Sequence, residues 1–419
     1  MTHASSAHLP RGLAVAVFLA FAFAYFFSAL VRAITATLSP TLTQEFGLSA
    51  RDLGLLAGGY FFGFSLTQLP LGRWLDRHGP KTVILAFLVL AVLGCLAFAW
   101  ADSFNGLLLA RVLCGIGVSA CLMAPLTGYR RWFDPTLQLR TNAWMLMTGS
   151  LGMLASTLPV QWLMPLWGWR AIFVALGAGI ALSMLLIWWI VPRWQAAAAA
   201  TPTPAAPADD DGSYRAIWRS RYFWRMAPIG FFTYGGMVAI QTLWAAPWMT
   251  QVAGWSARES ATGLFLINLA MLLAFWTWGW VTPALARRGL GADRLITLGM
   301  PLSFVLLAML VLLGPSVGDG TAGLLALFCV SCTFVSLAQP AVGMAFAPHL
   351  AGRALSAYNL VIFAGVFVVQ WGIGLGVDLA LGLGLSRVAA YQSAMAVFGL
   401  CSLLSWLFFL RFRAPAQDR

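Results

Sequence analysis

Long apolar segments recur along almost the whole chain, and they limit the possible folds more than any other feature of the sequence. An α-helix needs about 20 predominantly apolar residues to cross a bilayer, and short polar or Gly/Pro-containing turns separate segments of this size. Only 9% of the residues are charged and 61% are hydrophobic, whereas roughly 25% are charged in soluble domains. The sequence therefore predicts an all-α membrane protein.

Twelve membrane-spanning helices are expected. Their predicted spans are 12–39, 52–73, 81–101, 104–128, 139–163, 168–191, 225–250, 259–283, 294–314, 321–347, 354–379 and 387–411. The first span is too long for the core of a signal peptide. A Pro/Ala/Asp-rich linker without apolar periodicity follows the sixth span. The predicted organisation is a six-helix half (1–191), a cytoplasmic linker (192–224) and a second six-helix half (225–419).

The positive charges are distributed by membrane side. On the twelve-helix interpretation, 19 of the 25 Lys and Arg residues fall on one side, four fall on the other, and Arg32 and Arg111 lie within helices. Positive residues remain in the cytoplasm, so both termini are predicted to be cytoplasmic. The net charge of +12 then reflects topology, and no nucleic-acid partner is expected. The single Lys among many Arg suggests a bacterial source, and hence a multi-pass protein of the inner (plasma) membrane.

The stretch PLGRWLDRHGPKTV, residues 70–83, is the densest polar break in the first hundred residues. An Asp just beyond a helix end can face the positive N-terminus of another helix, and the first glycine would allow close approach of a neighbouring helix. The pattern G-x-x-x-D-R-x-G-x-K consists of Gly72, Asp76, Arg77, Gly79 and Lys81. It resembles the signature loop between the second and third helices of the major facilitator superfamily of secondary transporters.

This resemblance implies a transporter whose two halves rock about a central cavity and which usually works as a monomer. It also implies that the loop latches the halves on the cytoplasmic side when the transporter faces outward. A weaker echo of the pattern, without the Asp, lies at the equivalent place in the second half, at Gly279, Arg287, Arg288 and Gly289. Six plus six helices with this loop after the second helix of each half is the parallel-repeat architecture of the superfamily.

Arg32 lies in the first predicted helix, eight residues before Pro40. A charge within the membrane costs from ~3 to over ~10 kcal/mol, so such a residue indicates function, and the Arg fork fits a carboxylate or phosphate. The segment YFFSALVRAITATLSPTLTQEFGLS resembles helix 1 of the anion:cation symporters and organophosphate:phosphate antiporters, which implies that Arg32 binds an anion. Alternatively, Arg32 extends toward the interface or pairs with a helix-end carbonyl. Tyr25, Ser28 and Thr35 share its helix face.

Several positions depart from those branches. Many anion:cation symporters have acids where this chain has Val31 and Val118, so both expected proton carriers are absent. The antiporters add a second Arg in helix 7, but here that helix has only Arg225 at its cytoplasmic start. Arg111 begins the pattern R-x-x-x-G-x-G of helix 4 and either supports proton movement or braces the helix. The missing acids favour bracing.

None of the 13 acidic residues lies in the middle of a predicted helix, and Asp378, at the outer end of helix 11, is the deepest. Exporters of cationic drugs commonly need a buried carboxylate. We therefore expect secondary active or facilitative transport of a small organic anion that resembles a monocarboxylate. A proton-coupled exporter of drugs or metabolites on the same fold is the alternative.

Neutral polar side chains near the expected midplane either contact substrate or join helices. They are Tyr60, Thr148, Tyr234, Gln241, Asn268, Gln339, Asn359 and Gln370. Gln241 and Gln370 are preferred, because helices 7 and 11 line or flank the cavity in the family. Tyr25, Ser28, Tyr60, Asn268 and Gln339 complete the predicted site around Arg32. Trp144, Trp244 and Phe363 are candidates for packing against an apolar substrate body.

No metal, cofactor or enzyme activity is predicted. Cys329 and Cys332 form a C-x-x-C, but they lie within a spanning helix without a second pair and are interpreted as packing residues. The four His residues lie in tails or loops, and no nucleophile with an acid/base partner is visible. The expected partners are a small-molecule substrate and the lipid bilayer.

Overall fold

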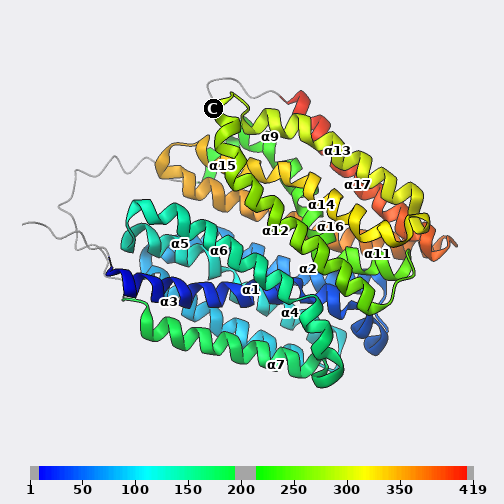
Figure 1. The fold of residues 1–419 in the computed structure, drawn as a ribbon, viewed down its shortest axis with the longest axis horizontal. Coiled ribbons are helices and arrows are strands. Elements are labelled where there is room, and N and C mark those ends of the chain that lie inside the picture. Colours follow the sequence, from blue (N-terminus) through cyan, green and yellow to red (C-terminus); the bar gives the residue numbers. More distant parts are fainter. Residues whose placement is uncertain (1–8, 194–213, 413–419) are drawn as a thin grey trace, which may run out of the picture.

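A computed structural model describes residues 9–193 and 214–412, and all regular structure within these ranges is helical (Figure 1). The central part of the predicted linker, 194–213, lies outside the described residues. The elements are α1 (Arg11–Phe46), α2 (Ala50–Leu66), α3 (Gln68–Ala99), α4 (Phe104–Val118), α5 (Ala120–Trp132), α6 (Pro135–Ala155), α7 (Leu158–Ile190), α8 (Tyr214–Arg219), α9 (Arg221–Ile229), η1 (Gly230–Tyr234), α10 (Gly235–Ala239), η2 (Ile240–Trp244), α11 (Ala245–Gln251), α12 (Ala257–Arg287), α13 (Ala292–Leu313), η3 (Gly314–Gly320), α14 (Thr321–Cys332), η4 (Thr333–Leu337), α15 (Ala338–Met344), α16 (Pro348–Gly382) and α17 (Arg387–Arg411).

Nine helical stretches in the described part of the chain are long and apolar enough to cross a membrane. One of them, Ala292–Met344, runs from α13 through α15 and contains 53 residues, far more than the ~20 that one crossing needs. The all-α membrane class is therefore confirmed. The division into twelve crossings stays a prediction.

Two glycines break long helices at places that the sequence predicts as turns. Gly79 in α3 has φ 76° and ψ 163°, and Gly168 in α7 has φ 70° and ψ 162°. Glycine adopts positive φ without the steric cost that a Cβ imposes. At Gly79 the chain passes from a continuation of α2, residues 68–78, into the next long helix.

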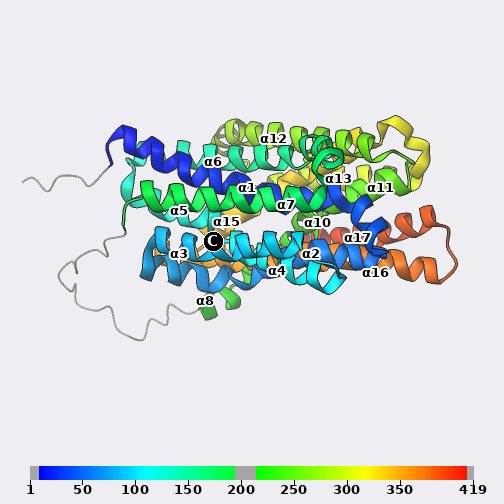
Figure 2. The same ribbon diagram turned by 90° about the horizontal axis from the view of Figure 1, so that it is seen from below.

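The helices form two groups that lie side by side. In Figure 1 the helices α1 to α7 occupy the lower part of the molecule and α9 to α17 the upper part, with α2 packed against α16 between them. We call residues 11–190 the first group and residues 214–411 the second group. Figures 1 and 2 show the start of α1 and the end of α7 at one end of the bundle, which we call the termini end. The α1–α2 and α16–α17 connections lie at the other, which we call the distal end.

Glycines of α4 bring backbones into contact within the first group. A Cβ on Gly115 would lie 1.9 Å from the carbonyl oxygen of Tyr60 in α2, and one on Gly117 would lie 2.2 Å from the backbone nitrogen of Ala91 in α3. No larger residue fits at such distances without displacing a helix. This packing holds Arg111, which lies one turn before Gly115, against α1 and α2.

Candidate functional site

Arg32 is surrounded by aromatic side chains. Its Cζ lies 5.9 Å from the centre of the Phe64 ring, and Tyr25, Tyr60 and Tyr234 lie close enough to interact electrostatically with the guanidinium. The Nε atom is buried without a hydrogen-bond partner, and no carboxylate of residues 9–193 or 214–412 forms an ion pair with Arg32. The site thus presents a positive charge with an unused donor.

Residues from both groups build this site. Tyr25 and Tyr60 come from α1 and α2, whereas Tyr234 is the last residue of η1 in the second group. The rings of Phe64 in α2 and Phe363 in α16 are 4.3 Å apart. The site therefore lies where the two groups meet.

Ser28 and Thr35 lie on the same helix as Arg32 and are 1% exposed. The hydroxyl oxygens of both are buried and have no partner in the described part of the chain. A buried hydroxyl without a hydrogen bond is unfavourable, so these two groups, like the Arg32 Nε, are unsatisfied polar groups in this structure. The shared face predicted from the sequence therefore carries unused hydrogen-bonding groups.

Arg111 is fully buried, and it holds the turn of α1 that carries Arg32. Its Nη1 donates a 2.8 Å hydrogen bond to the carbonyl of Val31, and its Cζ lies 5.0 Å from the centre of the Tyr60 ring. The Tyr60 hydroxyl in turn donates to the carbonyl of Ser28 at 3.3 Å. These contacts favour the bracing interpretation of Arg111.

Four of the predicted neutral contacts bind one another. Gln241 Nε2 donates to Asn268 Oδ1 at 2.9 Å, and Gln339 Nε2 donates to Asn359 Oδ1 at 2.7 Å. Asn268 also donates to the carbonyl of Leu264 at 2.8 Å. Each pair joins two elements of the second group, which favours the alternative that these amides connect helices.

Gln370 differs from the other amides. Its Nε2 donates to Thr242 Oγ1 at 3.0 Å, and its backbone carbonyl accepts from the Trp244 indole at 3.1 Å. Its Oε1 is buried and has no partner among the described residues. Trp244 is 1% exposed and Trp144 is 49% exposed, and among the three aromatic candidates Phe363 contacts Phe64, whose ring lies near Arg32.

The predicted latch residues Asp76 and Arg77 lie in the stretch of residues 70–83. Asp76 and Arg77 are exposed, and neither forms an ion pair with another described residue. A Cβ on Gly72 would meet no atom within 4 Å. No described residue approaches Gly72 closely in this structure, so the close helix approach that Gly72 would allow stays a prediction.

Lys81 also departs from the expected latch. Its Nζ donates to the carbonyls of Trp188 and Val191, both at 2.7 Å. Trp188 lies in the last turn of α7 and Val191 is its C-cap residue, where a helix leaves carbonyls without internal partners. Lys81 caps a helix of its own group here and does not join the two groups.

Arg225 is engaged as well. Its Nη1 forms an ion pair with Asp293 and its Nε donates to the carbonyl of Phe409 at 3.1 Å. The sequence placed Arg225 at the start of a helix but gave no partner. Since both ends of this guanidinium are used, Arg225 does not supply a second free positive charge.

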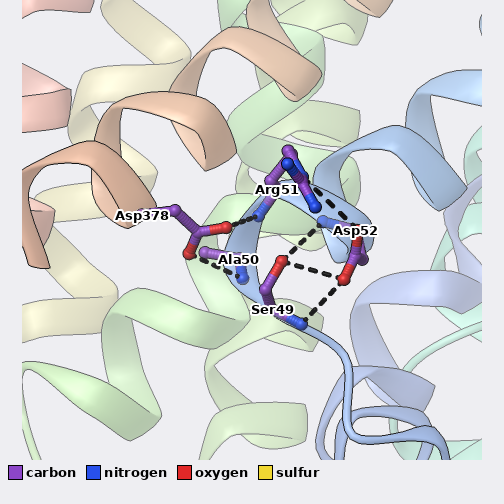
Figure 3. A network of polar contacts seen from close by, with 5 residues as sticks. All are labelled: Ser49, Ala50, Arg51, Asp52 and Asp378. Atoms are coloured by element: carbon purple, nitrogen blue, oxygen red, sulfur yellow. Dashed lines mark hydrogen bonds and ion pairs between the residues drawn. The ribbon is translucent and has the colours of Figure 1, made fainter. Parts of the chain in front are cut away.

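The contact that the sequence reasoning missed lies at the distal end. The Asp378 carboxylate accepts hydrogen bonds from the backbone nitrogens of Ala50, at 3.1 Å, and Arg51, at 2.9 Å (Figure 3). Asp378 belongs to α16 and the two nitrogens to α2, so the bonds connect the groups. The sequence indicated that Asp378 lies deeper in a predicted helix than the other acids, but it did not show which groups the carboxylate contacts.

Residues 21–370 match the family model described as Major Facilitator Superfamily. The chain belongs to this superfamily. Among its curated relatives is the gallate transporter of Pseudomonas putida, 30% identical over 176 residues that cover 42% of this chain and only 39% of that protein. The hexuronate transporter of Escherichia coli (strain K12) is 24% identical over 303 residues, covering 68% of each chain.

The solved structures show the same fold. A bacterial homologue of the human lysosomal transporter Spinster, in an inward-facing and unoccupied conformation, superposes with a TM-score of 0.77 over 98% of this chain and 99% of that chain, at 18% identity. The resemblance drawn from the polar loop is confirmed by the family match. The chain is a multi-pass membrane transporter of the Major Facilitator Superfamily.

Proposed function

We propose that this transporter moves a small organic anion with one carboxylate by alternating access. The observation that carries the proposal is the Arg32 guanidinium, whose buried Nε has no partner. A buried charge is costly unless it is paired, and a carboxylate bonded to the Arg fork would pair it. Ser28 and Thr35 offer further hydrogen bonds on the same face. Gallate and hexuronate, which give two relatives their names, are carboxylates.

The net charge of the site favours a monocarboxylate. Arg32 is the partly buried guanidinium with an unused donor at the junction. Arg225 is paired with Asp293. Arg111, a second charge without an ion pair among the described residues, is 0% exposed and is directed at the Val31 carbonyl and the Tyr60 ring. A phosphate ester would bring more negative charge than one guanidinium neutralises. The aromatic surroundings, with Phe64 and Phe363 in contact, suit an apolar or aromatic substrate body.

The proposed topology places the termini end in the cytoplasm of a bacterial cell. The Lys and Arg distribution supports this orientation. We propose twelve crossings in two halves, 1–191 and 225–419, joined by the linker 192–224, and a monomer as the working unit. Uptake by facilitated diffusion or exchange is the simplest mechanism, because no acid of the described residues pairs with Arg32 to carry a coupled proton.

Transport in proteoliposomes tests the role of Arg32. We expect Arg32→Ala to lower kcat/KM for the transported anion at least ~100-fold, because a broken buried charge pair costs ~3–5 kcal/mol, and Arg32→Lys to retain part of the activity. Arg258→Ala, at an exposed Arg of α12, is the control and should transport normally. Unchanged uptake of every transported anion by Arg32→Ala would refute the proposal.

A thermal-shift screen of the purified protein separates this proposal from drug or metabolite export. We expect benzoate-like and sugar-acid carboxylates to raise the Tm of the wild type but not that of Arg32→Ala. A screen in which organic cations raise the Tm and all anions are inert would favour the exporter instead.

A further inference from the structure

The two hydrogen bonds of Asp378 differ from the surface ion pairs of the chain, because they join the two helix groups through the backbone (Figure 3). Ala50 and Arg51 are the first two residues of α2. The first N–H groups of a helix have no hydrogen-bond partners within the helix. The helix dipole also favours a negative charge at this position. We call this contact the Asp378 clasp.

Other residues satisfy the rest of this helix start from within the first group. Ser49 accepts a hydrogen bond from the backbone nitrogen of Asp52, and the Asp52 carboxylate accepts from the Ser49 nitrogen at 3.2 Å. This capping box stabilises the N-terminus of α2 whether or not Asp378 is present. The clasp is therefore an addition from the second group, and it is not needed to form the helix.

The backbones of α2 and α16 touch beside the clasp. A Cβ on Gly54 would lie 2.4 Å from the carbonyl oxygen of Gln370, and one on Gly374 would lie 2.3 Å from the carbonyl oxygen of Ala50. Contacts this close require the distal ends of the two groups to be together. If the groups separated at this end, the clasp and the glycine contacts would break together.

A second acid, Asp76, lies near the other end of the α2 and α16 pair, at the termini end. Asp76 lies 26 residues after Ala50, about 39 Å along a helix at ~1.5 Å per residue. It follows the continuation of α2 near the termini end, where α16 begins at Pro348. Asp378 lies near the C-terminal end of α16 and binds the start of α2, and Asp76 follows the C-terminal end of α2. In this structure Asp378 is engaged, whereas Asp76 is exposed without an ion pair to any described residue.

We propose that the Asp378 clasp is the lock of the distal gate, which holds the distal end closed and must release before that end opens. The latch that the family resemblance already implies at Asp76 would be its counterpart at the termini end, so that one acid is engaged in each of the two end states. The inference concerns the equilibrium between conformations and does not depend on which solute is carried.

Distances between spin labels at each end test the lock in the full-length protein without substrate. The distal pair is Asn105→Cys with Ser316→Cys, and the termini pair is Arg130→Cys with Arg288→Cys, all at exposed positions. Cys401→Ser removes the one native cysteine that is not buried. We expect Asp378→Asn to raise the ratio of open to closed distal ends about two- to thirtyfold, the range for a charge at a helix start. Distances of the termini pair should shorten in parallel.

Asp52→Asn is the matched control, since it removes a carboxylate from the same helix start without touching the second group. It should leave both distance distributions unchanged, and Asp378→Glu, which keeps the charge, should resemble wild type. Asp76→Asn should shift the equilibrium in the opposite direction. An Asp378→Asn protein whose distributions match wild type, or an equal shift with Asp52→Asn, would overturn the proposal.

Discussion

The guanidinium of Arg111 donates a 2.8 Å hydrogen bond to the carbonyl of Val31, the residue that precedes Arg32. The Arg of the helix-4 motif therefore acts on the proposed anion site through the backbone of α1. Because Arg111 is 0% exposed and its Cζ also lies over Tyr60, it fixes two of the elements that surround Arg32. If Arg111 braces the site in this way, a change of Arg111 should alter both stability and the position of Arg32.

Arg111→Lys should destabilise the protein and weaken transport while keeping a positive charge. A lysine has no planar fork to reach the Val31 carbonyl while lying over the Tyr60 ring, and a hydrogen bond to a charged group contributes ~1.5–3 kcal/mol. We expect a loss of that size in the free energy of unfolding in detergent, and KM raised roughly tenfold by the displaced Arg32. If stability and KM were unchanged and only a pH gradient ceased to drive uptake, a role in proton movement would be correct.

Lys81→Met should lower stability without moving the gates. The substitution leaves the carbonyls of Trp188 and Val191 at the end of α7 without their cap, at a cost of ~0.3–1 kcal/mol for a partly exposed contact. Thermal unfolding measures this loss, and Lys81→Arg should recover part of it. A large change in the termini-end spin-label distances would show instead that Lys81 serves the latch.

Gly54→Ala should shift the protein away from the conformation described here. Its Cβ would lie 2.4 Å from the Gln370 carbonyl oxygen, so α2 and α16 would have to separate at the distal end. We expect more open distal ends in spin-label distances and a lower Tm. Gly72→Ala is the control, because a Cβ there meets nothing within 4 Å; equal effects of the two variants would contradict the packing argument.

A double-mutant cycle on Gln241 and Asn268 should show whether this amide pair connects helices. We expect Gln241→Leu and Asn268→Leu to be non-additive in stability by ~0.6–1.7 kcal/mol, the range for hydrogen bonds between membrane helices. Uptake by both variants should fall in parallel with stability only. Loss of uptake with additive, small stability effects would identify the amides as substrate ligands.

The sequence was sufficient for the family, the helical class and the two glycine turns, because these depend on local patterns. Gly79 shows this well: a Gly-Pro pair between apolar runs predicts a turn, and the residue has φ 76°. The grouping of Arg32 with Tyr25, Ser28 and Thr35 also followed from helix periodicity.

What the sequence did not supply is which helices touch. Gly54 and Gly72 look alike in the sequence, yet only Gly54 lies against a neighbouring backbone. Asp378 was noticeable as a deep acid, but its partners are backbone nitrogens more than 300 positions away, and backbone donors have no sequence signature. The pairing of Gln241 with Asn268 likewise depends on the depth and rotation of two helices.

Tyr234 is the last residue of the π-helical stretch Gly230–Tyr234. A second π-helical stretch, Ile240–Trp244, contains Gln241. A π turn holds an extra residue compared with an α turn, and one residue of an α-helix corresponds to ~100° of rotation. Conversion of either stretch to α-helical geometry would therefore turn Tyr234 or Gln241 to a new direction while the helix stays continuous. In the second group, Tyr234 lies near Arg32 and Gln241 binds Asn268. A change from π to α geometry would therefore rotate these side chains, which is a different movement from the rigid rocking of the whole group.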